Sequence, residues 1–365
     1  MTETLLYTPG HGVFTDTLIM YALTSALKDE VVKVEGIEGR YILSISLTLD
    51  DIAKKVASYF KDLKDSTINT VVNEYRFAGD PDKLESIFKD LLDENALVQY
   101  LKSLTTSNHI TAMSEGRGGK AKGKLWLFLA PHLGKYLPSE YKYKSKDYSV
   151  CHLCLGLALL GIANAMMTVR YVMGRGERRE FRRIGLLLSF DGIVKGSDLL
   201  KLLNVLKGEA FERAQRDLSD AARVLNTGTY ASLAITMFGK ELIDRLSLVE
   251  ASWRGLVVTY AYAQAGVIQI RGYEEISLDA VVDSLSRLAQ EVLREDEVPG
   301  IYLDQVKQLL RVFISKEEAA PIEALYRYFS SRNLEDLYTF SRLAFKVHGS
   351  GIGMNLCKAM SKLIQ

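Results

Sequence analysis

The longest uncharged stretch of the sequence runs from Tyr148 to Val169 and holds no Asp, Glu, Lys or Arg in 22 residues. Apolar surface of this extent is stable only in a bilayer or in the centre of a protein core. The stretch is long enough to span a membrane, but it is solitary and includes His152 and Asn164. Its second half also favours a strand. We therefore expect a buried helix followed by a strand, and no membrane association.

Short strands and amphipathic helices alternate before this stretch. Val31–Ile37 and Tyr41–Leu47 are β-branched and apolar runs on either side of a Glu-Gly-Arg turn, which predicts a hairpin. Apolar residues at helical spacing predict helices that begin near Val13, after the N-cap Thr48, and at Pro81.

The pattern then changes from strands to helices. Leu125–Ala130 predicts a buried strand, and Asn164–Met173 with Phe181–Phe190 predicts a second hairpin. Beyond Ser197 the periodicity is mainly helical, apart from a small hairpin expected within 267–276. The predicted fold class is α+β with a boundary near 192–196. Residues 1–195 form a mixed region of β-hairpins and helices, and residues 196–365 form a mainly α-helical region.

Charge is distributed unevenly, although the whole chain carries only +1. Residues 1–110 carry 11 Lys/Arg and 17 Asp/Glu, residues 111–215 carry 18 and 9, and residues 216–365 carry 17 and 19. The middle third is thus a basic island between acidic neighbours, which indicates a localised anionic partner such as nucleic acid. Three cysteines and an N-terminus without a signal-peptide pattern favour a cytoplasmic protein.

The basic island begins with a Gly-rich loop, Glu-Gly-Arg-Gly-Gly-Lys-Ala-Lys-Gly-Lys at 115–124. Its glycines let the backbone approach a ligand, and its cations suit a phosphate backbone, which needs charge more than fixed geometry. A solvated loop without a partner is the alternative. Arg117 is the candidate for reading a base edge. The candidate phosphate contacts in and after the loop are Lys120, Lys122, Lys124, Lys142 and Lys144.

A second basic cluster lies at the tip of the second predicted hairpin. Six arginines fall within residues 170–183, offset only by Glu177 and Glu180. The planar guanidinium group suits phosphate through its fork of donors. The candidate contacts here are Arg175, Arg178, Arg179, Arg182 and Arg183.

Aromatic side chains near the loop are candidates for stacking on unpaired bases. Tyr141 and Tyr143 alternate with lysines and are the better candidates. Trp126 is expected in the core, within the strand predicted at 125–130.

Gly118-x-x-x-x-Gly123-Lys124 matches most of the phosphate-loop signature. The segment differs from the signature at the next position, where Leu125 replaces the Ser or Thr that would ligate magnesium. A nucleotide-dependent enzyme with a degenerate phosphate loop is therefore a rival hypothesis. No nucleophile pattern or paired-carboxylate motif accompanies the loop, so we expect no enzyme activity and no catalytic residue.

Cys151-His-Leu-Cys154 offers two thiols at a spacing that zinc sites use. A structural site needs four ligands, and two buried thiols on an apolar helix are the simpler interpretation. We therefore expect no metal and no other cofactor. His11, which lies between two glycines, is expected to be a turn residue. The histidines that could complete a zinc site are His109, His132 and His152.

Three segments together resemble a known family. Tyr7-Thr-Pro-Gly-His-Gly-Val-Phe-Thr-Asp16 opens the first helix, the loop at 116–124 precedes Leu-Trp-Leu-Phe-Leu, and Cys151-His-Leu-Cys-Leu-Gly-Leu-Ala opens the uncharged stretch. In this order and at this length, the chain resembles the archaeal CRISPR-associated large subunit of the type I-A interference complex, Cascade. The resemblance covers most of the chain.

The resemblance implies a non-catalytic subunit of an RNA-guided surveillance complex. Its partners would be guide RNA, target DNA, the backbone subunits of the complex and the helicase-nuclease. Base pairing reads the target in such complexes, while protein reads shape and the short flanking motif. A third hypothesis is a purely structural assembly subunit that uses its helical half and never touches nucleic acid.

Overall fold

The computed structural model describes residues 3–75, 81–131, 148–174, 179–262, 268–293, 295, 297–348 and 350–364. Strands and helices mix in the N-terminal part and helices dominate the C-terminal part, so the predicted α+β class is confirmed. The chain divides into two compact units. Unit 1 comprises Met1–Met166, Leu187–Leu203 and Val258–Tyr273, and unit 2 comprises Met167–Leu186, Asn204–Val257 and Glu274–Gln365.

A seven-stranded sheet has the order β1-β3-β2-β8-β9-β10, with β7 paired to β8 off this path. The hairpin of β2 and β3 places Val32 opposite Ile45, and the antiparallel pair of β7 and β8 places Met167 opposite Leu186. Both hairpins are therefore present as predicted. The strands are β1 (Thr4–Tyr7), β2 (Val31–Ile37), β3 (Arg40–Ile45), β7 (Met167–Met173), β8 (Glu180–Lys195), β9 (Glu250–Tyr262) and β10 (Ile268–Ser277).

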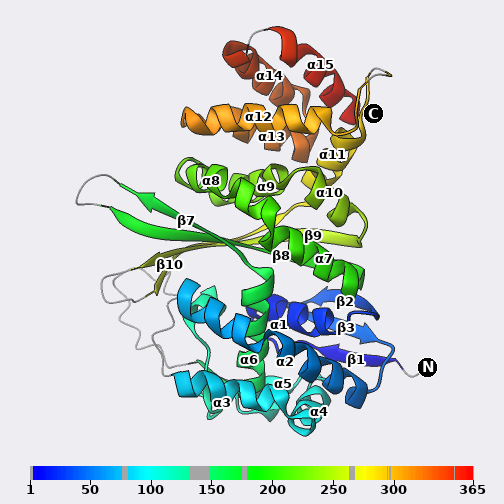
Figure 1. Ribbon diagram of the computed structural model, residues 1–365, viewed down its shortest axis with the longest axis vertical. Helices are drawn as coiled ribbons and strands as arrows, with labels where there is room; N and C mark the ends of the chain where they lie inside the picture. The colour runs from blue at the N-terminus through cyan, green and yellow to red at the C-terminus, as the bar shows by residue number, and fades with distance from the viewer. Residues whose placement is uncertain are drawn as a thin grey trace. The chain divides into compact units, whose positions relative to one another are not determined.

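Two helices whose residues are nearly all buried form the centre of unit 1. α1 (Val13–Ala26) packs against β3, against α2 (Leu49–Glu74) and against α6 (His152–Ala165), as Figure 1 shows. Because neighbours cover α1 and α6 on several sides, nearly all their residues are buried. The uncharged stretch is thus a buried helix followed by strand β7, as predicted. Among the described residues, no helix combines the length and apolarity that a membrane span requires.

A small antiparallel sheet carries the Gly-rich loop of unit 1. Its order is β4-β6-β5, with β4 (Gly116–Arg117) and β5 (Gly123–Lys124) on either side of β6 (Tyr148–Val150). The remaining helices of this unit are α3 (Pro81–Leu92), α4 (Glu94–Ser103) and α5 (His109–Ala112).

Unit 2 is built mainly from helices that pack in succession. Figure 1 shows α12 to α15 stacked together, and α13 also packs against α9 and α11. α7 (Gly196–Lys207) is divided between the units. The helices of unit 2 are α8 (Glu209–Val224), α9 (Thr227–Phe238), α10 (Lys240–Ser247), α11 (Asp279–Gln290), α12 (Ile301–Ser315), α13 (Ala319–Ser331), α14 (Leu334–His348) and α15 (Ser350–Ser361), followed by the 3₁₀ turn η5 (Lys362–Ile364).

The strand predicted at 125–130 is wrong. The segment forms instead a 3₁₀ turn, η1 (Leu127–Leu129). Side chains from elsewhere satisfy its carbonyls in place of a neighbouring strand. Thr15 Oγ1 donates to the Leu129 carbonyl at 2.8 Å, and the Tyr260 hydroxyl donates to the Phe128 carbonyl at 3.1 Å.

The small hairpin predicted within 267–276 is also wrong. β10 is a single strand, and its neighbour is β9, which has no counterpart among the predicted strands. The Val-Val-Thr-Tyr-Ala-Tyr run that ends β9 is rich in β-branched and aromatic residues, which is the signal that could have revealed it. The second hairpin begins at Met167, because α6 continues to Ala165.

Candidate nucleic-acid interface

The small sheet sets the direction of the loop cations. Gly116 in β4 and Lys124 in β5 both lie opposite Ser149, whereas Arg117 lies opposite Tyr148. Side chains alternate between the two faces of a sheet, so Arg117 and Lys124 point to opposite faces. The loop therefore presents its cations on two surfaces.

One of these surfaces borders a cleft of about 250 Å³ in unit 1. Lys122 and Lys124 line it at β5, and Lys83 lines it from the first turn of α3. All three lysines are exposed, and no carboxylate is among the lining residues. We call this site the lysine cleft. Its lining residues are Lys83, Ser86, Ile87, Lys122, Gly123, Lys124, Trp126, His152 and Leu155.

An indole lies beside the three lysines. Trp126 is half-buried, and its ring stacks on Phe128 with centroids 5.9 Å apart. Phe128 stacks in turn on Tyr75 at 5.1 Å. The expected core position of Trp126 is wrong, because the residue lies outside any strand and lines the cleft. The cleft thus combines three cations with an aromatic ring.

The degenerate phosphate loop lacks the backbone cradle that binds nucleotide phosphates. The N–H groups of Lys120 and Ala121 donate to the Ser114 carbonyl at 2.8 and 3.3 Å, and the Gly119 N–H donates to the Gly116 carbonyl at 3.1 Å. In phosphate-binding loops such amides point at the ligand. A Cβ on Gly119 would also overlap the Ser114 carbonyl, so packing within the loop requires this glycine.

The arginines of the second basic cluster belong to unit 2 and differ in environment. Arg183 is only 3% exposed, which removes it from the surface where phosphate would bind. Arg182 forms an ion pair with Glu180. Arg179 and Arg170 are exposed. The candidates that lie outside the described residues are Arg175, Arg178, Lys142, Lys144, Tyr141, Tyr143 and His132.

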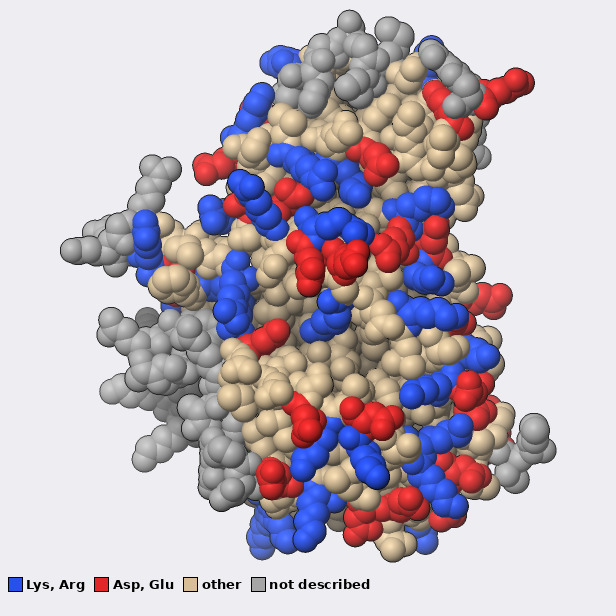
Figure 2. Space-filling model, viewed as in Figure 1, with Lys and Arg blue, Asp and Glu red and all other residues tan. Residues whose placement is uncertain are grey.

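The described surface shown in Figure 2 carries Lys and Arg side chains interspersed with Asp and Glu. Several charged side chains of the described residues pair locally, such as Lys240 with Asp244 at 2.8 Å and Arg287 with Asp283 at 3.2 Å. By contrast, no carboxylate of the described residues forms an ion pair with Arg117, Lys120 or Lys122. Arg117, Lys120 and Lys122 are therefore available to an external anion.

A cluster of four side chains, of which three are buried and Cys151 is half-buried, lies at the base of the loop. It consists of His109, Glu115, Cys151 and Cys154, whose candidate ligand atoms all lie within 4.8 Å of one another. His109 begins α5, Glu115 precedes β4, Cys151 is the N-cap of α6, and Cys154 lies in its first turn. We call this set the four-ligand cluster. Of its members, Glu115 alone has no counterpart among the predicted site residues, because no sequence spacing links it to the cysteines.

The members of the four-ligand cluster alter one another's pKa. Burial would lower the pKa of His109, but hydrogen bonds with Cys151 and Glu115 raise it to about 9. Burial would raise the pKa of Glu115, but hydrogen bonds with His109 and His11 bring it well below its usual range. A hydrogen bond with Cys154 lowers the pKa of Cys151 to about 7. These pKa shifts favour an ionised Glu115 carboxylate beside a protonated His109 ring.

His11 belongs to the surroundings of this cluster and is more than a turn residue. It is 2% exposed, and its Nε2 lies 3.0 Å from Glu115 Oε2. Its Nδ1 lies 3.2 Å from the Tyr148 hydroxyl. His11 thus connects the start of α1 to the carboxylate that precedes the loop.

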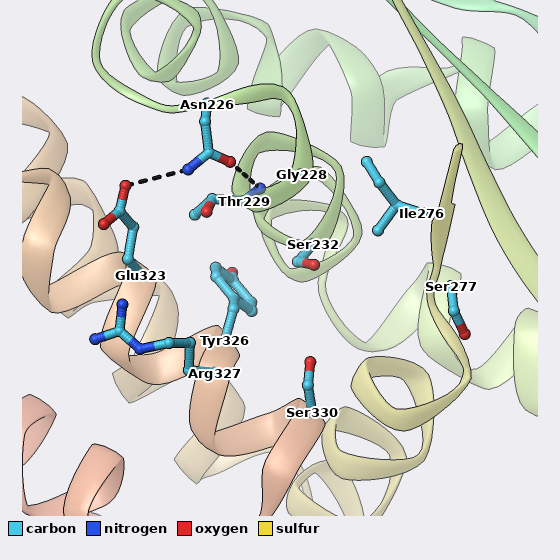
Figure 3. A pocket seen from close by; sticks show the side chains of 10 residues that line it. All are labelled: Asn226, Gly228, Thr229, Ser232, Ile276, Ser277, Glu323, Tyr326, Arg327 and Ser330. Carbon is cyan, nitrogen blue, oxygen red and sulfur yellow. Dashed lines mark hydrogen bonds between the residues drawn. The ribbon is translucent and has the colours of Figure 1, made fainter. Parts of the chain in front are cut away.

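A second hollow, of about 380 Å³, lies in unit 2 at the start of α9 (Figure 3). Asn226 caps α9 by accepting from the Thr229 N–H at 2.8 Å, and its Nδ2 donates to Glu323 Oε1 at 3.2 Å. Arg327, from the same helix as Glu323, donates to Asp336 at 3.0 Å. These polar groups bind one another, so we assign the hollow to helix capping and helix packing.

A family model described as CRISPR-associated protein (Cas_Csa4) matches residues 4–352 of the chain. No curated protein gives a significant match. The matched region includes the whole lysine cleft and the whole four-ligand cluster.

Proposed function

Since this chain belongs to the Cas_Csa4 family of CRISPR-associated proteins, we propose that it is the non-catalytic large subunit of an archaeal type I-A surveillance complex. In this role it binds nucleic acid through the lysine cleft. The observation that carries the binding is the convergence of Lys83, Lys122 and Lys124 beside Trp126. The subunit assignment rests on the family and on the resemblance of the three segments.

Electrostatics favour a phosphate backbone in this cleft. Lysine ammonium groups that neutralise phosphates release condensed counterions, which drives association. The first turns of α3 and α6 also contribute lining residues, and the amino ends of helices carry partial positive charge. No carboxylate lines the cleft itself, and the Asp90 carboxylate beside it pairs with the lining residue His152 at 2.9 Å.

Trp126 indicates which form of nucleic acid the cleft takes. An aromatic ring can stack on an unpaired base, whereas the bases of a duplex are already stacked on their neighbours. The cleft volume of about 250 Å³ also suits a short single-stranded segment better than a duplex. We therefore propose that the cleft holds unpaired target DNA or guide RNA, while Arg117 on the opposite face of the small sheet contributes to recognising the flanking motif.

A salt titration with matched variants tests the proposal. Wild-type protein, the variant Lys83→Ala/Lys122→Ala/Lys124→Ala and the control Lys54→Ala/Lys61→Ala/Lys102→Ala would be compared on single-stranded DNA and RNA. The control removes three exposed lysines of the same unit that lie outside the cleft. The cleft variant should lower the slope of log K against log salt by about 2, and the control should leave it unchanged. Equal slopes for all three proteins would contradict binding at the cleft and move the site elsewhere on the chain. Absence of binding by the wild-type protein would favour a purely structural assembly role.

A further inference from the structure

We infer that the four-ligand cluster is a structural zinc site that clamps the Gly-rich loop to helices α5 and α6. The ligands are His109 Nε2, one Glu115 carboxylate oxygen and the sulfurs of Cys151 and Cys154. The inference does not rest on nucleic-acid binding, because none of the four ligands lines the lysine cleft.

The separations between ligand atoms fit a tetrahedral zinc shell. His109 Nε2 lies 3.3 Å from Cys154 Sγ and 3.3 Å from Glu115 Oε2, and the Cys154 sulfur lies 4.0 Å from that oxygen. Zinc bonds of about 2.0 to 2.3 Å give a tetrahedron with edges of about 3.3 to 3.8 Å. The three edges therefore need adjustments of only a few tenths of an ångström to enclose the ion.

Hydrogen bonding orients the imidazole of His109 as a ligand. Ser103 Oγ donates its single proton to the Tyr100 carbonyl at 2.6 Å and lies 2.7 Å from His109 Nδ1. Ser103 must therefore accept from the Nδ1–H, which directs Nε2 into the cluster. An outer hydrogen bond of this kind is typical of histidines that bind metal.

The start of α6 brings the two thiols together. Cys151 Sγ accepts from the Cys154 N–H at 3.3 Å, as an N-cap, and the amino end of a helix stabilises thiolates. The Tyr100 hydroxyl lies 3.4 Å from Cys154 Sγ and can donate to its thiolate. Sulfur donors select zinc over magnesium or calcium.

Burial identifies the site as structural. His109 and Cys154 are 1% exposed, Glu115 is 8% exposed and Cys151 is half-buried. With four protein ligands, a tetrahedral ion has no position left for a substrate. Two thiolates and one carboxylate leave the zinc site with one net negative charge. The ring of His11 lies beside that charge, with its Nε2 3.0 Å from Glu115 Oε2.

The ligands come from three parts of the chain and hold two strands of the small sheet, β4 and β6. Glu115 directly precedes β4, and Cys151 directly follows β6, which pairs with β4 and β5. Zinc at this point therefore fixes the register of the small sheet, and through β5 it fixes the position of Lys124.

Metal analysis of the full-length protein tests the inference. We expect about one zinc per chain after purification without chelator, measured by plasma mass spectrometry. Cobalt exchanged into the site should give the intense visible bands of a tetrahedral ion and a thiolate charge-transfer band. Cys154→Ser and His109→Ala should lose the metal. The controls Cys357→Ser and His152→Ala should retain it, since neither residue belongs to the cluster.

Wild-type protein alone decides the question if the ligand variants do not fold. Protein that stays free of zinc and cobalt in zinc-supplemented medium, or that carries a Cys151–Cys154 disulfide in place of metal, would overturn the inference. So would Cys154→Ser protein with full zinc content. Because metal content is measured without nucleic acid, zinc-free protein that still binds DNA at the lysine cleft would overturn the zinc site and leave the proposed function intact.

Discussion

Glu115 Oε1 accepts a hydrogen bond from the backbone N–H of Cys151, which lies 36 positions further along the chain. The other carboxylate oxygen of Glu115 contacts the rings of His11 and His109. One side chain thus joins the start of α1, the start of α5 and the N-cap of α6 at the point where the Gly-rich loop begins. The position of the loop cations depends on this buried carboxylate.

Removing the charge of this carboxylate should destabilise unit 1. Glu115→Gln keeps the size of the side chain but removes the buried carboxylate that His11 and His109 contact, which should lower the free energy of unfolding by about 3 kcal/mol. Chemical denaturation would measure it. Glu85→Gln, on the exposed face of α3, is the control and should change stability by less than about 0.5 kcal/mol. Similar values for both variants would show that Glu115 does not organise the cluster.

The contact between α1 and α6 requires a glycine. A Cβ on Gly161 would overlap the backbone carbonyl of Leu18, which cannot move away as a flexible side chain could. Gly161→Ala should therefore lower the free energy of unfolding by about 1 to 3 kcal/mol. Gly228→Ala in α9 is the control, because its Cβ would make ordinary van der Waals contacts with Asn226 Oδ1 at 3.4 Å and Ile276 Cδ1 at 3.9 Å. Thermal unfolding should show a lower midpoint for the first variant and an unchanged or higher one for the second.

Asn226 should contribute separately as a helix cap and as a partner of Glu323. Asn226→Ala removes both contacts and should cost about 1 kcal/mol or more. Asn226→Asp keeps the acceptor for the Thr229 N–H but sets a carboxylate against Glu323, and the additional change Glu323→Gln should recover stability. A double-mutant cycle with no coupling between positions 226 and 323 would contradict the contact.

Arg117 and Lys124 should have different effects on binding, because their side chains point to opposite faces of the small sheet. Lys124→Ala should weaken binding to all sequences alike, as expected for a phosphate contact. Arg117→Ala should weaken binding most on duplexes that carry the preferred flanking motif, by about 1 to 3 kcal/mol. Competition assays with motif and scrambled duplexes would measure the difference. If Arg117→Ala weakened binding equally on motif and scrambled duplexes, Arg117 would be a phosphate contact and would not read the motif.

The local pattern of apolar, polar and capping residues was sufficient to predict helices and strands that depend on contacts with residues nearby in the sequence. The hairpin of β2 and β3, the N-cap Thr48 and the buried helix α6 each follow from short-range spacing or composition. The 3₁₀ turn η1 did not, since its carbonyls are satisfied by Thr15 and Tyr260, more than a hundred residues away. The apolar run of η1 is therefore indistinguishable from a strand in the sequence.

The lysine cleft and the four-ligand cluster could likewise be predicted only in part. The lysines at 122 and 124 stand out in the sequence, but Lys83 gives no local signal because it joins them only when α3 packs near β5. Of the partners of Cys151 and Cys154, His109 is one of three histidines that the sequence offers as zinc ligands, whereas Glu115 gives no local signal. His109 and Glu115 lie 45 and 39 positions from Cys154, and only the fold brings their ligand atoms together.

The most direct test of the account is the fluorescence of Trp126 during titration with a short single-stranded oligonucleotide. The chain has two tryptophans, and the other, Trp253, is 2% exposed and serves as an internal reference. Stacking of a base in the lysine cleft should quench Trp126 to saturation. The signal should vanish in Trp126→Phe and should need far higher DNA concentrations in the cleft triple-lysine variant. Binding that saturates by an independent method while Trp126 emission stays constant would contradict the lysine cleft as the nucleic-acid site.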